Sequence, residues 1–361
     1  MKIGLVGIGG YGQFLLEVIK EIKGFEIFAI SSRDSKKLEK IAKKFEVLNT
    51  FTSWKELIKN KDIEAVVIST PPYLHFEMAK LALISGKHVL IEKPLTMNTN
   101  EANILIKLAQ KKNLRLVVDH ELRYSPIFIG LKKIVDLDLF GNLLNINFTN
   151  FASDEGLAPD HWFWDKKKSG GIFIEHSCHF FDSYGDIFGK SKIKYSTRQL
   201  RSNGVEDRVF ALNQYENGAI GSYLHAFNMP SALEQTSSKI TFERANVLIE
   251  GWVPLKLTAK AVLSQSELKH VKEIFPLAYF KIPGNSKNYL GGGKEYPDHM
   301  LIEFNLDLGN KDKNYRALVS KLFEDFIKCV NDKDFDHPTS AKNVISGLDL
   351  ACQSAKIAKL I

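Results

Sequence analysis

The stretch "GLVGIGGYG", residues 4–12, decides the fold class of this chain. It joins an apolar run with strand character, Lys2–Val6, to a segment with helical periodicity from about Tyr11 to Lys23. A glycine-rich turn between a strand and a helix is the usual start of a sheet whose strands alternate with helices. The beginning of the chain therefore predicts an α/β domain with a parallel sheet.

The glycines of this turn have G-x-G-x-x-G spacing, with Gly7, Gly9 and Gly12 at the fixed positions. In that pattern the first glycine permits a tight turn, the second lets the backbone approach a pyrophosphate, and the third lets the helix pack closely on the strand. The amides and the dipole of the helix N-terminus favour an anion. We therefore expect a dinucleotide here, with Gly10 and Tyr11 also contacting it. The alternative is a turn with a purely structural role.

The residues after the second expected strand, Phe25–Ile30, bear on which dinucleotide binds. The chain continues with Ser31, Ser32, Arg33 and Asp34. An acid at this position would accept hydrogen bonds from the ribose hydroxyls of NAD, whereas serines and a guanidinium suit the 2′-phosphate of NADP. Asp34 is also the expected N-cap of the next helix. We therefore favour NADP over NAD; the alternative treats Arg33 as a solvated loop residue.

Strands and helices continue to alternate up to about residue 121. The further expected elements are helices at Ser35–Phe45, Glu77–Ile84 and Asn100–Lys112, and strands at Ala65–Ile68, Val89–Ile91 and Leu114–Val118. This order predicts βαβ units. Residues 1–121 are therefore expected to form a Rossmann NAD(P)-binding domain.

The pattern changes after residue 122, where short segments alternate apolar and polar residues in the manner of antiparallel strands. Helical patterns occur at Pro126–Val135, Tyr315–Val330 and Ser340–Ile361, whereas "YLGGGKEYPDH", residues 289–299, is interpreted as a loop. Residues 122–361 are expected to form an α+β domain with an open, mostly antiparallel sheet, and its C-terminal helix can pack back on the first domain. That domain is expected to bind substrate and to mediate oligomer contacts.

Composition excludes several classes of protein. The chain of 361 residues carries a net charge of +7, but its lysine runs have no aromatic platform, which argues against nucleic-acid binding and still suits an anionic ligand. No apolar run is long enough to span a membrane. Three distant cysteines, Cys178, Cys329 and Cys352, have neither metal-site spacing nor a disulfide pattern. A cytoplasmic location is expected.

Charged residues follow directly on the apolar run of "HVLIEKPLT", residues 88–96. Ligands of parallel sheets bind beyond the carboxyl ends of the strands, which is where Lys93 is expected to face a nicotinamide. A lysine is a useful acid or base only if its pKa falls. Pro94 would fix the local backbone. Thr70 and Pro71, in the turn after the strand at Ala65–Ile68, are expected to contact the same cofactor.

"SGGIFIEHSCHFFD", residues 169–182, opens with a glycine pair and is interpreted as a helix. Glu175 and His179 are four residues apart and share a helix face, and Asp182 is placed to orient the imidazole of His179. Histidine suits proton transfer near neutral pH. A metal site is the competing interpretation, but no third ligand is evident, and a purely structural helix is the other alternative.

Together these stretches resemble the glucose–fructose oxidoreductase, inositol dehydrogenase and MocA (Gfo/Idh/MocA) family. The matching stretches are "GLVGIGGYG", "STPPYLHFEMAKLALISGKHVLIEKPL", "GGIFIEHSCHFFD" and "YENGAIGSY", in family order. The resemblance implies hydride transfer between NAD(P) and a hydroxyl carbon of a sugar, polyol or similar molecule. It also implies a homodimer or homotetramer built through the sheet of the second domain.

The resemblance assigns roles to residues of this chain. It implies that Lys93 lines the reaction centre, that Pro94 is cis and that Glu92 contacts the cofactor. His75 matches a family position near the nicotinamide. The family's G-G-x-x-x-D-x-G-x-H pattern falls on Gly170, Gly171, Glu175 and His179, with Glu175 in place of the usual aspartate and a serine after His176 where glycine is usual. Residues 119–121 also depart from the family, whereas Arg123 is retained.

Three functional hypotheses follow. In the first, the chain is an NADP-dependent oxidoreductase in which Lys93 and His179 handle the hydroxyl proton, Glu175 positions both, and the choice of principal acid or base stays open. Substrate contacts are then expected from Arg123, His176 and Trp162, with Trp164 and His225 as further candidates. The second is a glycoside hydrolase that uses transient oxidation by a held dinucleotide. The third is a non-catalytic NADP-binding sensor or scaffold.

Overall fold

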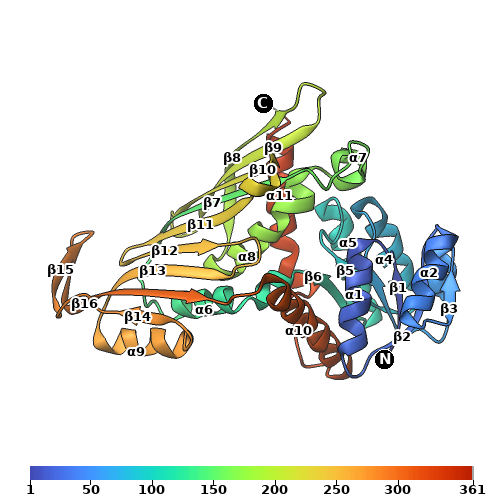
Figure 1. Cartoon of the computed structure of the whole chain (residues 1–361), viewed down its shortest axis with the longest axis horizontal. Coiled ribbons are helices and arrows are strands. Elements are labelled where there is room, and N and C mark those ends of the chain that lie inside the picture. Colours follow the sequence, from blue (N-terminus) through green and yellow to red (C-terminus); the bar gives the residue numbers. More distant parts are fainter. Residues whose placement is uncertain (360–361) are drawn as a thin grey trace. The chain divides into compact units, whose positions relative to one another are not determined.

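The computed structural model describes residues 1–359, and its contacts divide the chain into two compact units (Figure 1). The first unit comprises Met1–Glu121, Trp162–Asp182 and Arg316–Cys352. The second comprises Leu122–His161, Ser183–Tyr315 and residues 353–359. Two lengths of chain from beyond residue 121 therefore pack with the N-terminal sheet. Within residues 1–359, no helix is long and apolar enough to cross a membrane.

The first unit is built on a six-stranded parallel sheet with the order β3-β2-β1-β4-β5-β6, the order of dinucleotide-binding folds. Its strands are β1 (Lys2–Val6), β2 (Glu26–Ser31), β3 (Asn49–Phe51), β4 (Ala65–Ile68), β5 (His88–Glu92) and β6 (Leu116–Asp119). Every residue of β4 is buried, as expected for a strand covered on both faces. Burial of each such Val or Ile side chain contributes about 1.5–3 kcal/mol. The predicted Rossmann-type domain is confirmed.

The helices between these strands begin near the residues that the sequence indicates. They are α1 (Gly10–Glu21), α2 (Ser35–Phe45), α3 (Trp54–Lys59), α4 (His75–Ile84) and α5 (Thr99–Lys112). The carboxylate of Asp34 accepts a hydrogen bond from the amide of Lys37 at 3.0 Å, so the predicted N-cap of α2 is confirmed. The pattern analysis missed β3 and α3, because three and six residues are too short to show a period.

Most of two helices from the end of the chain, α10 (Lys311–Asn331) and α11 (Ala341–Ile357), belongs to the first unit and completes it. Val117 of β6 bridges to Ser340, so the edge strand of the sheet is covered. Arg115 caps the end of α10 by donating to the carbonyl of Cys329 at 2.6 Å. The helix expected at Ser340–Ile361 is thus present to Ile357, and residues 360 and 361 lie outside the described residues.

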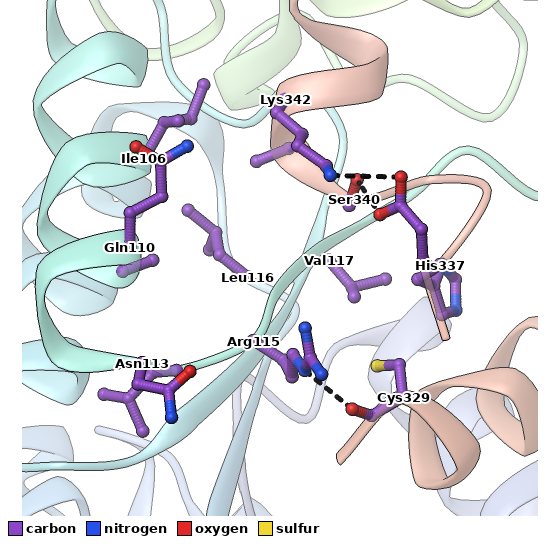
Figure 2. Close-up of a pocket in the computed structure, with 14 residues that line it drawn as sticks. Ile106, Gln110, Asn113, Arg115, Leu116, Val117, Cys329, His337, Ser340 and Lys342 are labelled. Atoms are coloured by element: carbon purple, nitrogen blue, oxygen red, sulfur yellow. Dashed lines mark hydrogen bonds and ion pairs between the residues drawn. The ribbon is translucent and has the colours of Figure 1, made fainter. Parts of the chain in front are cut away.

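A cavity of about 290 Å³ lies between α5, the beginning of β6 and the beginning of α11 (Figure 2). Its polar groups bind one another, because Lys342 pairs with Asp336 at 3.0 Å and Arg115 donates to a main-chain carbonyl. The cavity faces the amino end of β6, whereas ligands of such sheets bind at the carboxyl ends. The candidate site therefore lies elsewhere.

The second unit contains a ten-stranded sheet with the order β14-β16-β13-β12-β11-β7-β10-β9-β8, in which β15 pairs with β16. Its strands are β7 (Leu143–Ser153), β8 (Ser191–Leu200), β9 (Glu206–Tyr215), β10 (Ile220–Met229), β11 (Gln235–Phe242), β12 (Ala245–Glu250), β13 (Lys256–Leu263), β14 (Tyr279–Lys281), β15 (Lys287–Gly291) and β16 (Lys294–Asp307), accompanied by helices α6 (Pro126–Asp136) and α9 (Gln265–Ile274). Only β7 and β10 pair in parallel in the described part of this sheet. The predicted open, mostly antiparallel sheet is confirmed.

The loop predicted at residues 289–299 is wrong, because this segment forms the β15–β16 hairpin (Figure 1). Gly292 and Gly293 form its two-residue turn, with φ angles of 57° and 75°. Two consecutive residues with positive φ match the twist of a hairpin, and glycine adopts them without strain. The glycines that suggested a loop therefore make the turn between two strands.

Candidate functional site

The glycine turn after β1 has the geometry that a pyrophosphate requires. A Cβ at Gly7 would lie 2.2 Å from the carbonyl oxygen of Ser69, and one at Gly12 would lie 2.0 Å from that of Gly7. At Gly9 and Gly10, in contrast, a Cβ would meet no atom within 4 Å. No side chain caps α1, and its first turn carries no acid. The N-terminus of α1 is therefore uncapped by any side chain, and space is open beside Gly9 and Gly10, which fits the phosphates of a dinucleotide.

Gly12→Ala is expected to destabilise the fold by about 1–3 kcal/mol and to abolish dinucleotide binding, because the added carbon would overlap a main-chain oxygen that cannot move alone. Gly9→Ala is the matched control. It adds the same methyl group where space is open, so it should preserve the melting temperature and weaken only the binding of the dinucleotide. Thermal unfolding and calorimetric titration measure both effects. A Gly12→Ala protein with native stability and affinity would contradict this account of the turn.

The residues after β2 lie at the same end of the sheet. The hydroxyl of Ser32 accepts a hydrogen bond from the amide of Asp34 at 3.3 Å, and the Asp34 carboxylate caps α2. Ser31 is buried, whereas Arg33 is exposed. Arg33 makes no ion pair with any residue in the range 1–359. The acid here is thus engaged by the backbone, and the guanidinium is available to a ligand.

His75, at the start of α4, links two turns through the hydrogen bonds of its two ring nitrogens. Its Nδ1 lies 2.7 Å from the carbonyl oxygen of Pro94, and its Nε2 lies 2.7 Å from that of Thr70. Complete burial lowers the pKa of His75 to about 4, although both carbonyls favour the charged form. The visible role of this neutral imidazole is to hold the turn after β4 against the segment after β5. Its predicted contact with the cofactor stays a prediction, as do those of Thr70 and Pro71.

Lys93 follows the last residue of β5, and its peptide bond to Pro94 is cis. The ammonium group donates to the Glu175 carboxylate at 2.6 Å and to the Glu175 main-chain carbonyl at 2.9 Å. Burial lowers the pKa of Lys93, but the charge and hydrogen bond of Glu175, together with the charges of Cys178 and Glu92, outweigh this, and the net shift is upward. Lys93 therefore keeps its proton, unlike the lysine of lowered pKa that general acid–base catalysis would require.

Two carboxyl groups lie side by side at the ends of β5 and β6, because the sheet register pairs Glu92 with Asp119. The hydroxyl of Tyr11 donates to Asp119 at 2.8 Å. Burial raises the pKa of Glu92 well above its usual range, and the neighbouring Asp119 raises it further. Burial also raises the pKa of Asp119, although the Tyr11 hydroxyl opposes this shift. The surroundings of both carboxyl groups thus favour their protonated forms, and Tyr11 is linked to the pair through Asp119.

The helix predicted at residues 169–182 is present, but it begins with a π-helical turn, Phe173–Ser177, before α8 (Cys178–Phe188). Such turns are frequent at functional sites. The turn places the Glu175 side chain and main-chain carbonyl on Lys93, while His179 follows in α8. Sequence spacing alone does not reveal this change of helical period.

Two histidines and two acids form a buried cluster at the end of β6 and on α8. Nδ1 of His120 lies 3.6 Å from the carboxylate of Asp182, and Nδ1 of His179 lies 4.0 Å from that of Glu121. The two imidazole rings meet edge to face, with centroids 5.6 Å apart and an angle of 84°. Burial lowers the pKa of His179 well below its usual value, and the charge of Lys93 adds to the shift. His179 is therefore neutral at neutral pH.

The two domain models of one family match this chain. Residues 1–120 match the oxidoreductase family GFO_IDH_MocA, described as an NAD-binding Rossmann fold, and residues 128–246 match the C-terminal domain of the same family. The two models together cover about two thirds of the chain and occur in the order expected of the family. The chain belongs to the Gfo/Idh/MocA family. The predicted resemblance and the predicted oxidoreductase class are confirmed at this level.

The curated relatives are distant in sequence. A trans-1,2-dihydrobenzene-1,2-diol dehydrogenase of Bos taurus is 27% identical over 335 residues, which cover 91% of this chain and 95% of the relative. An oxidoreductase of Synechocystis is 29% identical, but the match covers only 53% of this chain and 52% of that protein. Among solved structures, a levoglucosan dehydrogenase in complex with NADH superposes over 100% of this chain and 97% of its own, with a TM-score of 0.80 and 18% identity. At that identity the likeness shows the fold.

The remaining predicted contacts of the family pattern fall in both units. His176 and Trp162 belong to the first unit, where His176 is buried and its ring lies 5.5 Å from that of Phe180. Arg123 belongs to the second unit, where it pairs with Asp186 at 3.0 Å. Substrate contacts of these residues stay predictions. Within residues 1–359, no three His, Cys, Asp or Glu side chains are placed to hold a metal ion.

The candidate site contains pairings that sequence reasoning did not find. Asp182 was predicted to orient His179, and the structure places its carboxylate beside His120. Glu121 was noted only as a departure from the family and lies beside His179. The one sequence signal for both is the position of His120 and Glu121, directly after β6 at the edge where ligands bind.

Proposed function

We propose that this chain is an NADP-dependent oxidoreductase acting on a secondary alcohol, or the matching carbonyl, of a sugar, polyol or similar small molecule. The carrying observation is the ion pair of Lys93 with Glu175 directly beyond β5, with His179 near enough for the charge of Lys93 to lower its pKa, in the unit whose α1 N-terminus has no side-chain cap. The substrate class is supported by the names of similar proteins. They include the diol dehydrogenase, the levoglucosan dehydrogenase and a UDP-N-acetylglucosamine 3-dehydrogenase.

The charge states of the two candidate catalytic residues divide their roles. A nicotinamide dinucleotide held at the glycine turn supplies the hydride acceptor or donor. Lys93, which keeps its proton because Glu175 lies against it, holds the substrate oxygen and stabilises negative charge on it. His179, which is neutral, accepts the hydroxyl proton during oxidation and returns it during reduction. Glu175 positions the ammonium group through two hydrogen bonds.

The preference for NADP rests on Arg33, which is exposed next to an acid that already caps α2. Arg33→Ala is expected to weaken NADPH binding about tenfold, or about 1.4 kcal/mol, and to leave NADH binding nearly unchanged. Asp34→Asn is the matched control, since asparagine also caps helices and only the charge is lost. Calorimetric titration of each protein with NADPH and NADH measures both affinities. If the unaltered chain binds NADH more tightly than NADPH, and Asp34→Asn weakens the binding of NADH, then Asp34 binds the ribose of NAD.

The reaction itself is tested by following nicotinamide absorbance with a panel of sugars, polyols and diols. Turnover with at least one member, lost in the Lys93 and His179 variants described below, is the expected result. Release of free sugar from a glycoside without net change in absorbance would favour the hydrolase. Dinucleotide binding without turnover of any member would favour the sensor or scaffold.

Assembly and location are further parts of the proposal. Strands β7, β8 and β10 expose Leu144, Tyr195 and Ile220, which suits a homodimer or homotetramer built through the sheet of the second unit. Light scattering of the purified protein measures the oligomer size. The three cysteines, which are all unpaired in the structure, suit the reducing cytoplasm.

A further inference from the structure

Helix α11 crosses α8 at main-chain contact distance. A Cβ at Gly347 would lie 2.7 Å from Cβ, 2.8 Å from Cα and 2.8 Å from the amide nitrogen of Asp182. Gly347 is buried, and its φ lies outside the left-handed region, so the backbone conformation does not require glycine. What the position requires is the absence of a side chain, because no movement of a flexible neighbour would make room.

Asp182 belongs to the candidate site. It is completely buried, and its carboxylate lies 3.6 Å from Nδ1 of His120. The ring of His120 meets that of His179 edge to face. A series of direct contacts therefore leads from Gly347 through Asp182 and His120 to His179, entirely within the first unit.

The position of α11 is fixed on both sides of the crossing. At its beginning, Ser340 bridges to β6, and Lys342 pairs with the carboxylate of Asp336 (Figure 2). Asn343 also donates to this carboxylate. Two residues after Gly347, Asp349 accepts a hydrogen bond from Thr99 of α5 at 3.3 Å. A side chain added at the crossing would consequently displace α8 against the site rather than push α11 away.

We propose that Gly347 is a positioning residue of the site. Because Gly347 has no side chain, the backbone of α8 can pack closely against it. This packing holds the Asp182 carboxylate against His120 and so sets the tilt of His179. This inference rests on the proposed function for its catalytic consequence. The structural part of the proposal is that a glycine on another helix places two imidazole rings. This part holds whether or not the chain turns over a substrate. Gly347 itself touches neither substrate nor cofactor in this account.

Gly347→Ala is expected to lower kcat about tenfold or more, with KM and the dinucleotide Kd within about twofold of their original values. The imidazole NMR signals of His120 and His179 should shift, whereas those of His270 and His299, which belong to the second unit, should not. Gly185→Ala is the matched control. It adds the same methyl group to α8 where no atom lies within 4 Å, so kcat and the histidine signals should stay unchanged. A folded Gly347→Ala protein with unaltered kcat and histidine signals would overturn the proposal.

Asp182→Asn tests the same contacts without steric change, should the alanine variant fail to fold. It keeps the packing against Gly347 and removes the charge that faces His120. We expect a comparable loss of kcat, a changed pH profile and shifted signals of both histidines. An unaltered pH profile and unaltered signals would refute the link from Asp182 to His179. If the unaltered chain turns over no member of the panel, the proposed function fails, while the histidine signals still decide the positioning role.

Discussion

Lys93→Met is expected to lower the rate of hydride transfer about 10³-fold, while the Kd of the dinucleotide changes little. The ammonium group is the charge that we assign to the substrate oxygen, and Glu175 holds it in place with two hydrogen bonds. Its removal also leaves a largely buried carboxylate without its partner, which costs about 3 kcal/mol of stability. Single-turnover absorbance measurements and chemical unfolding separate these two losses.

The double variant Lys93→Met with Glu175→Gln is the control for stability. It removes both charges of the pair and keeps the volumes similar, so we expect a melting temperature near that of the unaltered chain. Hydride transfer should stay as slow as in the single variant. A double variant that is both stable and fast would show that the ion pair has a structural role only. A single variant that keeps more than about a tenth of the original rate would contradict the role of Lys93.

His179→Gln is expected to slow hydride transfer about 10²-fold, because glutamine fills a similar space but cannot accept the hydroxyl proton. Since the pKa of His179 is lowered, its imidazole stays neutral as the pH falls below 6.5, and alcohol oxidation by the unaltered chain should persist there. The pH–rate profile measures this. The control is His270→Gln, at an exposed histidine of the second unit, which should leave the profile unchanged. A normal rate in His179→Gln would exclude the histidine as the base.

The same lowered pKa has a consequence for stability with a definite sign. The unfolded chain takes up a proton on His179 near pH 6.5, but the folded chain does not. The free energy of unfolding therefore decreases as the pH falls below about 6.5, by about 1.4 kcal/mol per pH unit for each such histidine. His179→Gln should unfold with a weaker pH dependence than the unaltered chain. Urea titrations near pH 7 and near pH 5 provide the comparison.

The sequence predicts the first unit well where its signals are local. The glycine turn, the caps and the alternation of apolar runs with helical periods place α2 and β4 at the same residues as the structure does. Sequence patterns do not reveal an element that is very short, such as β3. They also mislead where glycines can mark either a loop or a hairpin turn, as between β15 and β16. The sequence allowed for a return of the C-terminal helix to the first domain, but it did not reveal that Trp162–Asp182 also belongs to the first unit, because that depends on contacts between residues far apart in the chain.

The candidate site was likewise predictable from the sequence only in part. The resemblance to the family predicts that Lys93, Glu175 and His179 share one site, and the structure adds the direct contact between Lys93 and Glu175. The direction of the Lys93 pKa was not predictable from its position after a strand, because it depends on a carboxylate 82 residues away. The pairing of Asp182 with His120 was likewise hidden, since spacing rules relate residues on one helix and say nothing of a neighbouring strand.

The three separate lengths of chain in the first unit also have a meaning for biosynthesis. The ribosome makes the dinucleotide-binding sheet first, but Ser340, which bridges to the edge strand β6, emerges more than 200 residues later. Until then β6 has an unpaired edge, and the ring of Phe25 has not yet packed against Phe323 and Phe326. An uncovered strand edge favours aggregation of a nascent chain, and the sheet that is made first is covered only near the end of translation.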